Sequence, residues 1–410
     1  MNVSPNFSPK IELMKPYFFL SAGFYFLSML WLFFMNPLSD FTDFTLIGWV
    51  HLYMIGFVMM AFFSAMSQLG PIVIESGHYN VQIFKYLWVL LTLGLVLLLI
   101  GFYKDITFLL YGGSFILMAM LIYAVEFLQT LRKSKRKTAI TKAMSMSNIS
   151  LIIGISTGLV MAMGFNNKLA INPEDFLKMH TFGLIVGFVI LLIMGISLVL
   201  IPMFGFSKRI SDNEFKSSFY TLTLGVTFML LSPFFLPTIF ENLSYFFTII
   251  AISLFFYQLF KMTESRKRIV HDIWAKSMYV AYSSFLFAFI ILITYLLSEN
   301  SAMLRVGMWL LFIGFFGFVI MGNFYKIIPF LVWFHIYSPL IETQSVPMLH
   351  ELLPNRLATL QWFFSLSGLV LTTIAIALLN QKLFIGGVLL LSSASLIFFI
   401  IIIKLLKLKI

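Results

Sequence analysis

The sequence predicts an all-α integral membrane protein with about twelve transmembrane helices. Of its 410 residues, 60% are hydrophobic and only 10% are charged. The mean hydropathy is +0.99, and the apolar residues gather in long runs separated by short polar segments. Water-exposed surfaces do not tolerate this composition, and a spanning helix needs about 20 apolar residues. Soluble enzyme folds are therefore excluded, and the lipid bilayer is the expected environment.

Twelve apolar runs are long enough to cross a bilayer. In chain order they cover residues 15–36, 45–74, 84–103, 106–130, 146–165, 176–206, 216–238, 240–262, 273–297, 303–334, 357–380 and 383–403. No short apolar segment with a small-residue cleavage site precedes the first run, so we expect a retained helix and not a signal peptide. The whole chain, residues 1–410, is predicted to form one polytopic membrane domain.

The formal net charge is +11, and the lysines and arginines lie mainly between the apolar runs. This placement indicates membrane topology, and we predict no nucleic-acid partner. With a cytoplasmic N-terminus, the outer loops hold five of the 27 lysines and arginines, which leaves 22 inside. The five are Lys104, Lys168, Lys178, Arg305 and Lys382. The densest inner cluster comprises Arg132, Lys133, Lys135, Arg136, Lys137 and Lys142. We predict a multi-pass protein of the cytoplasmic (inner) membrane with both termini cytoplasmic. Binding of anionic lipid headgroups or another anionic partner to these clusters is the alternative.

A residue skeleton recurs three times along the chain. A Gly-Phe pair is followed by a small residue eight positions after the glycine and by a proline fifteen positions after it. The residues are Gly56, Ser64 and Pro71; Gly187, Gly195 and Pro202; and Gly314, Gly322 and Pro329. Successive prolines are 131 and 127 residues apart, which corresponds to four spans with their loops. We therefore predict three four-helix repeats, at approximately 15–135, 146–262 and 273–403, in a pseudo-threefold arrangement. The small residues predict close helix packing.

Two histidines, His51 and His180, lie within spans. They precede Pro71 and Pro202 by 20 and 22 residues, which places both about 30 Å from the proline end of the helix and near the outer face. An imidazole inside an apolar span is expensive unless it has a partner, so both are candidate cofactor and metal ligands. The alternative is an interfacial histidine that bonds a neighbouring helix or a headgroup. Zero cysteines exclude thiolate-held zinc, iron–sulfur clusters and covalent c-type haem.

These features together resemble the catalytic subunit I of haem-copper oxidases and nitric oxide reductases. The resemblance rests on twelve spans in three four-helix arcs, and on a second helix with His51 ahead of a Gly-Phe pair and a terminal proline. Residues 325–335, YKIIPFLVWFH, are similar to a small, single-chain, divergent branch of that superfamily. The resemblance implies a b-type haem with His51 as an axial ligand. It also implies respiratory electron transfer or O2 or NO chemistry, and an electron donor or other respiratory subunits as partners.

The chain departs from that family at several ligand positions. Helix ten of the oxidases supplies a His-x-His pair, but Gly307 and Trp309 stand 22 and 20 residues before Pro329. His180 is followed by Thr-Phe-Gly and not by the Pro-Glu-Val-Tyr pattern of the family, and helix seven contains no histidine. A complete copper centre cannot be assembled from this chain alone. An oxidoreductase of this kind would therefore be a divergent one.

Two ligand arrangements for a b-type haem remain open. His51 and His180 form a pair in the first, and one of them is joined by a methionine such as Met54 in the second. Two other functions also remain open, namely a secondary transporter or channel and a non-catalytic membrane protein without haem. The four-helix period favours the respiratory class, because many transporters repeat in halves of six spans. A haem-and-copper protein of the nitric-oxide-response type usually carries paired histidines, which this chain lacks.

Few other polar residues are expected inside the spans. Glu126 is the clearest carboxylate, and a polar path is predicted at the cytoplasmic ends of helices two and ten, where Lys326 is expected to extend to the interface. The path comprises Ser64, Ser67, Gln68, Asn323, Tyr325 and Lys326. Residues 335–356 contain three prolines and predict an interfacial cytoplasmic loop. Two histidines in that loop, His335 and His350, are weak candidates for metal binding.

Overall fold

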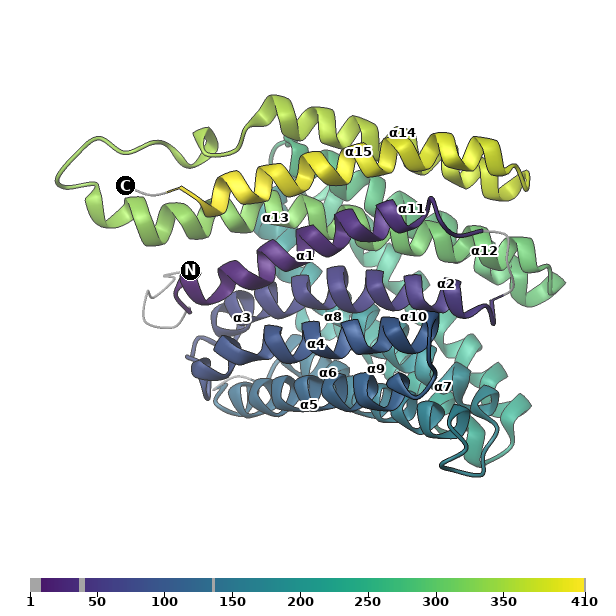
Figure 1. The fold of residues 1–410 in the computed structure, drawn as a ribbon. Helices are drawn as coiled ribbons and strands as arrows, with labels where there is room; N and C mark the ends of the chain where they lie inside the picture. The colour runs from purple at the N-terminus through teal and green to yellow at the C-terminus, as the bar shows by residue number, and fades with distance from the viewer. Residues whose placement is uncertain (1–8, 37–40, 135–136, 409–410) are drawn as a thin grey trace. The chain divides into compact units, whose positions relative to one another are not determined.

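The computed structural model describes residues 9–36, 41–134 and 137–408, and within these ranges the chain is helical without strands (Figure 1). Lys135 and Arg136 of the predicted basic cluster lie outside the described residues. The described part contains twelve helices that are long and apolar enough to cross a membrane. The predicted multi-pass integral membrane protein is thereby confirmed, and a lipid bilayer is its environment.

The candidate spans agree closely with the twelve apolar runs. They cover Ile11–Trp31, Phe44–Ile74, Val81–Tyr103, Phe108–Arg132, Ala139–Phe165, Pro173–Gly205, Asp212–Phe234, Pro237–Glu264, Ile273–Ser298, Ser301–Leu340, Asn355–Ala377 and Gln381–Leu406. Several boundaries differ by a few residues, and the fifth span begins seven residues earlier than predicted, at Ala139. The tenth span continues to Leu340, so the start of the predicted 335–356 loop is helical.

The chain divides into two compact units, which we describe separately. Unit 1 runs from Met66 to Val270, and unit 2 combines Pro9–Ala65 with His271–Ile410. The repeat boundaries predicted from the sequence do not coincide with these units, and they stay predictions.

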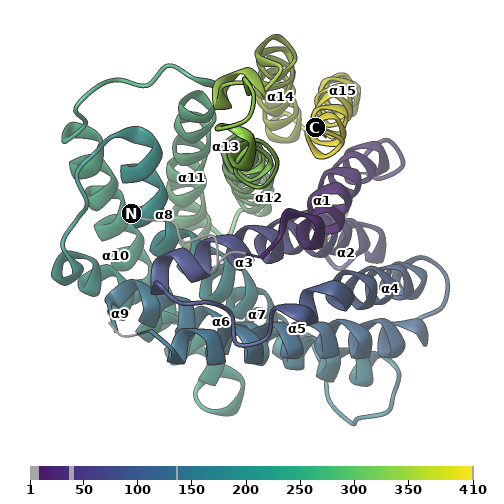
Figure 2. The ribbon, with the colours of Figure 1, turned by 90° about the vertical axis from the view of Figure 1, so that its left-hand side faces the viewer.

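Unit 1 contains α4 to α10 and the second half of α3. The helix bounds are α3 (Met60–Ile74), α4 (Phe84–Tyr103), α5 (Phe108–Arg132), α6 (Ala139–Phe165), α7 (Leu177–Phe182), α8 (Leu191–Gly205), α9 (Asp212–Leu231) and α10 (Pro237–Glu264). Helix α4 packs on α5, α5 on α6, and α9 on α10 (Figure 2). The contact between α4 and α5 is close because Gly112 faces it: a Cβ there would lie 2.5 Å from the backbone nitrogen of Leu98. Small residues therefore set this helix pairing.

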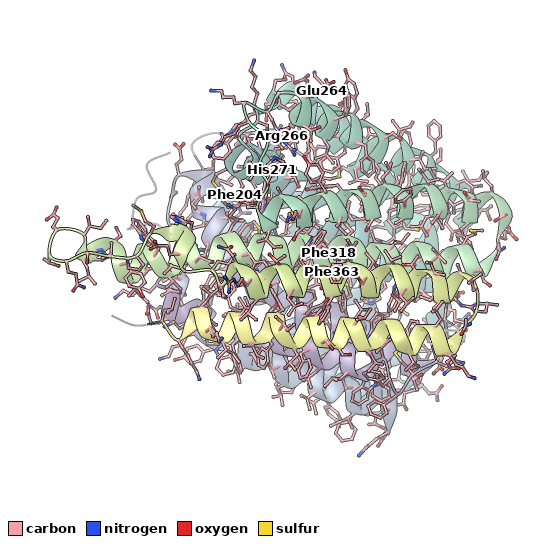
Figure 3. The ribbon with its side chains drawn as sticks, turned by 90° about the horizontal axis from the view of Figure 1, so that it is seen from above. Phe204, Glu264, Arg266, His271, Phe318 and Phe363 are labelled. Carbon is pink, nitrogen blue, oxygen red and sulfur yellow. The ribbon has the colours of Figure 1, made fainter. Side chains whose placement is uncertain are left out.

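Unit 2 contains the first helices and the last five. The bounds are α1 (Ile11–Trp31), α2 (Phe44–His51), α11 (Ile273–Ser298), α12 (Ser301–Trp309), α13 (Gly317–Val332), α14 (Asn355–Ala377) and α15 (Gln381–Leu406). Helix α15 packs against both α14 and α1, and α11 packs against α12 and α13. Figure 3 labels Phe318, which is buried on α13, and Phe363, which is 57% exposed on α14. Helix α14 thus presents an apolar side chain of the kind that lipid covers.

The three helices that carry the recurring skeleton are the most enclosed. In the spans Phe44–Ile74, Pro173–Gly205 and Ser301–Leu340, the most apolar stretch is 72%, 89% and 72% buried, against 22% to 50% in the other nine spans. These three helices therefore leave the least surface uncovered, whereas the others present one face outward.

Candidate functional site

His51 ends α2 in unit 2 and is half-buried. Its Nδ1 lies 2.8 Å from the carbonyl oxygen of Ile47, one helical turn earlier. A carbonyl oxygen only accepts hydrogen bonds, so Nδ1 carries the proton. In the neutral imidazole, Nε2 then carries the lone pair, which is the tautomer that ligates a metal through Nε2.

His180 lies on α7 in unit 1 and is also half-buried. Its Nδ1 lies 2.8 Å from the carbonyl oxygen of Gly154 on α6. Gly158, one turn further along α6, makes room for the ring, since a Cβ at that position would lie 2.7 Å from the imidazole Cε1. His180 therefore has the same tautomer as His51, but a neighbouring helix orients its ring. This bond is also the one expected of a histidine that only joins two helices.

The two histidines belong to different units. Each is oriented by a carbonyl of its own unit, and their pairing on one haem stays a prediction. Within the described residues, no group of three or more His, Asp or Glu side chains is placed to hold a metal ion.

Trp309 stands at a position where the resemblance to the oxidases implies a histidine, and its surroundings are closed. It is 7% exposed and stacks on Trp49 with ring centroids 5.8 Å apart and planes 19° apart. Its indole Nε1 donates to the Thr372 hydroxyl at 2.9 Å. One turn after Trp49, the Tyr53 hydroxyl donates to the Phe312 carbonyl oxygen at 2.8 Å. The interface between α2 and α12 is thus filled by stacked aromatic rings.

Gly307 stands at the other such position and packs against α11. A Cβ there would lie 2.8 Å from both Cγ and Cδ2 of Leu292. A histidine at this position would therefore displace the Leu292 side chain.

Each motif helix contains a π-helical turn at the same place. The turns cover Leu52–Met59, Gly183–Ile190 and Leu310–Phe316, and each starts four residues before the motif glycine. A π-helical turn displaces the regular hydrogen-bond ladder and is frequent at functional sites. In unit 2, carbonyl oxygens of two turns accept from side chains of other helices, Phe57 from Ser21 at 3.0 Å and Phe312 from Tyr53.

The motif glycines lie at close helix contacts. A Cβ on Gly187 would meet the Ser150 Cβ of α6 at 2.9 Å, and one on Gly314 would meet the Ser284 Oγ of α11 at 2.5 Å. Gly322 also packs on α11. Gly195 differs, because its nearest neighbour would stand at an ordinary 3.5 Å. The Ser64 hydroxyl donates to its own helix at the Ala61 carbonyl oxygen.

All three motif prolines lie inside helices and not at their last residues. Pro71 and Pro202 stand three residues before the ends of α3 and α8, and the helix that contains Pro329 continues to Leu340. Proline has no N–H, so each one frees the carbonyl oxygen four residues earlier. For Pro71 that residue is Ser67, whose carbonyl oxygen lies 2.7 Å from His78 Nε2.

His78 and Glu126 form a buried pair in unit 1 that the sequence did not reveal. Their side chains are 2% and 3% exposed, and His78 Nδ1 lies 3.0 Å from Glu126 Oε1. The sequence places His78 in a loop, 48 residues away from Glu126. Two signals point toward the pair: a carboxylate inside a span, which requires a partner, and the carbonyl that Pro71 frees.

The predicted polar path contains a surface ion pair in unit 2. Lys326 Nζ lies 2.6 Å from Asp272 Oδ2, and both side chains are about one-third exposed. The Trp274 indole donates to Asn323 Oδ1 at 3.2 Å, and the Tyr325 hydroxyl donates to Gln361 Oε1 at 3.0 Å. Lys326 is thus fixed by the residue that caps α11.

Comparison of the chain with protein-family models and with curated proteins gave no match.

Proposed function

We propose that this chain is an integral membrane haem protein with the plan of haem-copper oxidase subunit I, three four-helix repeats and an incomplete ligand set. Three enclosed helices support this plan. Each contains a π-helical turn that starts four residues before the glycine of a Gly-Phe pair. The proposed role is respiratory electron transfer or O2 or NO chemistry.

One observation carries the haem proposal, namely the hydrogen bond from His51 Nδ1 to the Ile47 carbonyl oxygen. Axial histidine ligands bind iron through one ring nitrogen, while the other donates to a carbonyl or carboxylate that fixes the ring. His51 meets this requirement at the start of a π-helical turn in an enclosed span. Its donor chemistry therefore fits a b-type haem.

The closed aromatic interface restricts where that haem lies. Trp49 and Tyr53 are two residues before and after His51, so in a helix they point to the face roughly opposite His51. That face is filled by Trp309 and by the bond from Tyr53 to Phe312. We therefore place the haem on the face of α2 that carries His51 and not between α2 and α12.

Met54 is a poor second ligand for the same iron. It stands three residues after His51, and side chains three apart lie on one face of a helix. Two side chains on one face of one helix do not lie on opposite sides of a bound group, so His51 and Met54 would not hold it together. His180 remains the proposed alternative, with Gly158 providing space for its ring.

A haem bound in this way supplies one-electron redox chemistry. The residues of this chain would orient the imidazole through the Ile47 carbonyl oxygen. We propose no copper site, because helices seven and ten lack the histidines of the oxidases. Turnover would then require another subunit or a haem with an open coordination position.

The test is a reduced-minus-oxidised absorption spectrum of purified protein, recorded for wild type, His51→Ala and His180→Ala. We expect a b-type α band in wild type and its loss in His51→Ala. His350→Ala is the matched control, because His350 lies outside the spans, and its spectrum should equal that of wild type. Electron paramagnetic resonance then separates six-coordinate low-spin iron from an open high-spin site. A colourless wild-type protein refutes the haem proposal.

A secondary transporter or channel is the second candidate, and the buried pair of His78 and Glu126 favours it. Ionisable residues inside membrane spans often mark ion or proton pathways. A colourless preparation that moves protons or a solute across proteoliposome membranes would support this function instead.

A further inference from the structure

The buried pair His78 and Glu126 holds the segment 75–80 against two helices of unit 1. Besides the contact with His78, Glu126 Oε1 accepts from the Thr130 hydroxyl at 2.7 Å and from the Asn80 backbone N–H at 3.2 Å. The Tyr79 N–H donates to the Thr130 hydroxyl oxygen at 2.9 Å. The segment is therefore fixed to α5 through Glu126 and Thr130.

The other side of the imidazole attaches the segment to α3. His78 Nε2 lies 2.7 Å from the Ser67 carbonyl oxygen. This carbonyl lacks its helical partner because residue 71 is proline. His78 thus replaces the hydrogen bond that Pro71 cannot make, and an unpaired buried carbonyl is costly.

These contacts require one proton between His78 and Glu126. The Ser67 carbonyl oxygen only accepts, so His78 Nε2 carries a hydrogen. Nδ1 and Glu126 Oε1 are 3.0 Å apart, so one of these two atoms must also carry a proton. Without it, two lone pairs face each other at hydrogen-bond distance. That proton is present both in an imidazolium paired with a carboxylate and in a neutral imidazole paired with a carboxylic acid.

The surroundings make that proton important for the local structure. Glu126 Oε2 is buried and has no hydrogen-bond partner within the described residues. Loss of the proton would leave a net negative charge on a carboxylate that is 3% exposed, which is strongly unfavourable. Release of the segment to water is the simplest way to relieve that charge.

We propose that His78 and Glu126 form a proton-binding site whose single exchangeable proton holds the segment 75–80 closed on α3 and α5. When the pH rises, the proton leaves to water and the segment opens. In the released pair, water solvates both the carboxylate and the neutral imidazole, so no proton is needed between them. Closing therefore takes up one proton, and the closed state is favoured at low pH and lost as the pH rises. The proposal is independent of haem.

Several other groups face the pair. From α4, the Phe84 ring packs edge-on against His78, and from the end of α5, Lys133 Nζ donates to the His78 carbonyl oxygen at 2.8 Å. The titratable and charged groups on the surrounding elements are Glu75 and Tyr79 on the segment, Tyr123 and Lys133 on α5, and Lys85 on α4. Substitution of Glu126 or His78 distinguishes the proposed site from these groups.

The test uses a spin label on the segment. The chain has no cysteine, so Tyr79→Cys provides a single labelling site, and Tyr79 is 63% exposed. The labelled full-length protein in lipid nanodiscs is measured by electron paramagnetic resonance from pH 6 to 9. We expect an immobile label at pH 6 and a mobile component at higher pH. The ratio of open to closed should rise by up to about tenfold per pH unit and return on acidification.

Glu126→Gln is the decisive variant. A carboxamide N–H donates to the lone pair of neutral His78 without an extra proton, but it cannot accept the bond from the Asn80 N–H. We expect a label whose mobility does not change between pH 6 and 9. His78→Ala removes both bonds and should leave the label mobile at every pH. His350→Gln is the control, and it should keep the wild-type pH response.

Two outcomes overturn the proposal. The first is a wild-type label that stays immobile from pH 6 to 9, which would make the pair a static ion pair. The second is a Glu126→Gln protein with the same pH response as wild type, which would assign the transition to another group. If His78→Ala does not fold, Glu126→Gln decides the question alone, because it conserves side-chain size.

Discussion

At the residue scale, backbone carbonyls determine what each histidine can do. His51 and His180 each use Nδ1 to bond a carbonyl oxygen, which leaves the metal-ligating tautomer. His78 uses one nitrogen for a carbonyl and the other for Glu126. Histidine is therefore a candidate iron ligand at positions 51 and 180 and part of a candidate proton site at position 78.

Substitution of Trp309 tests how firmly the interface of α2 and α12 is closed. Trp309→Phe keeps a ring against Trp49 but loses the bond to Thr372, and should lower the free energy of unfolding by about 1 kcal/mol. Trp309→Ala leaves a cavity and should lower it by about 3–5 kcal/mol. Unfolding in sodium dodecyl sulfate measures both. Equal small effects would show that the rings are not packed as described.

At the element scale, the motif helices combine small residues, a π-helical turn and an internal proline. The glycines allow neighbouring helices to approach, the π-helical turn offers carbonyl oxygens to other side chains, and the proline frees one more carbonyl. These features concentrate unpaired backbone groups in the most enclosed helices, where side chains from other elements must satisfy them.

Two glycine substitutions compare a close helix contact with an ordinary one. A Cβ at position 314 would lie 2.5 Å from the Ser284 Oγ, whereas a Cβ at position 195 would lie 3.5 Å from Ala143. Gly314→Ala should therefore destabilise the protein by about 1–3 kcal/mol, and Gly195→Ala should have a much smaller effect. Thermal unfolding in detergent gives the comparison. A larger loss for Gly195→Ala would contradict the close packing of the turn Leu310–Phe316 on α11.

The spans could be predicted from the sequence because a bilayer imposes length and apolarity directly. The π-helical turns could not, since hydropathy carries no signal for a shifted hydrogen-bond ladder. Likewise, Trp309 was recognised as a departure from the oxidase pattern, but its stack with Trp49 depends on tertiary packing. The end of the tenth span was misplaced because residues 335–340 are helical although two of them are Ser and Pro.

The candidate residues divide in the same way. His51 and His180 stand out in the sequence because an imidazole in an apolar run is unusual. His78 was missed because it lies between runs, and loops are normally exposed. Its burial depends on Glu126 and on the carbonyl freed by Pro71. These contacts join residues 48 and 11 positions apart, so a search limited to single helices does not detect them.

At the scale of the whole molecule, twelve spans make a multi-pass membrane protein. Inner-membrane location, cytoplasmic termini and the threefold repeat remain predictions. The central claim is that the enclosed second span holds a haem through His51. If this claim holds, the purified chain contains haem in a fixed ratio to polypeptide.

The most direct measurement is haem content per polypeptide, determined as the pyridine haemochrome of purified protein expressed with ample haem supply. We predict about one b-type haem per chain for wild type and for His350→Ala, and close to none for His51→Ala. A wild-type chain without haem would contradict the account, as would a His51→Ala protein that keeps the wild-type content and spectrum.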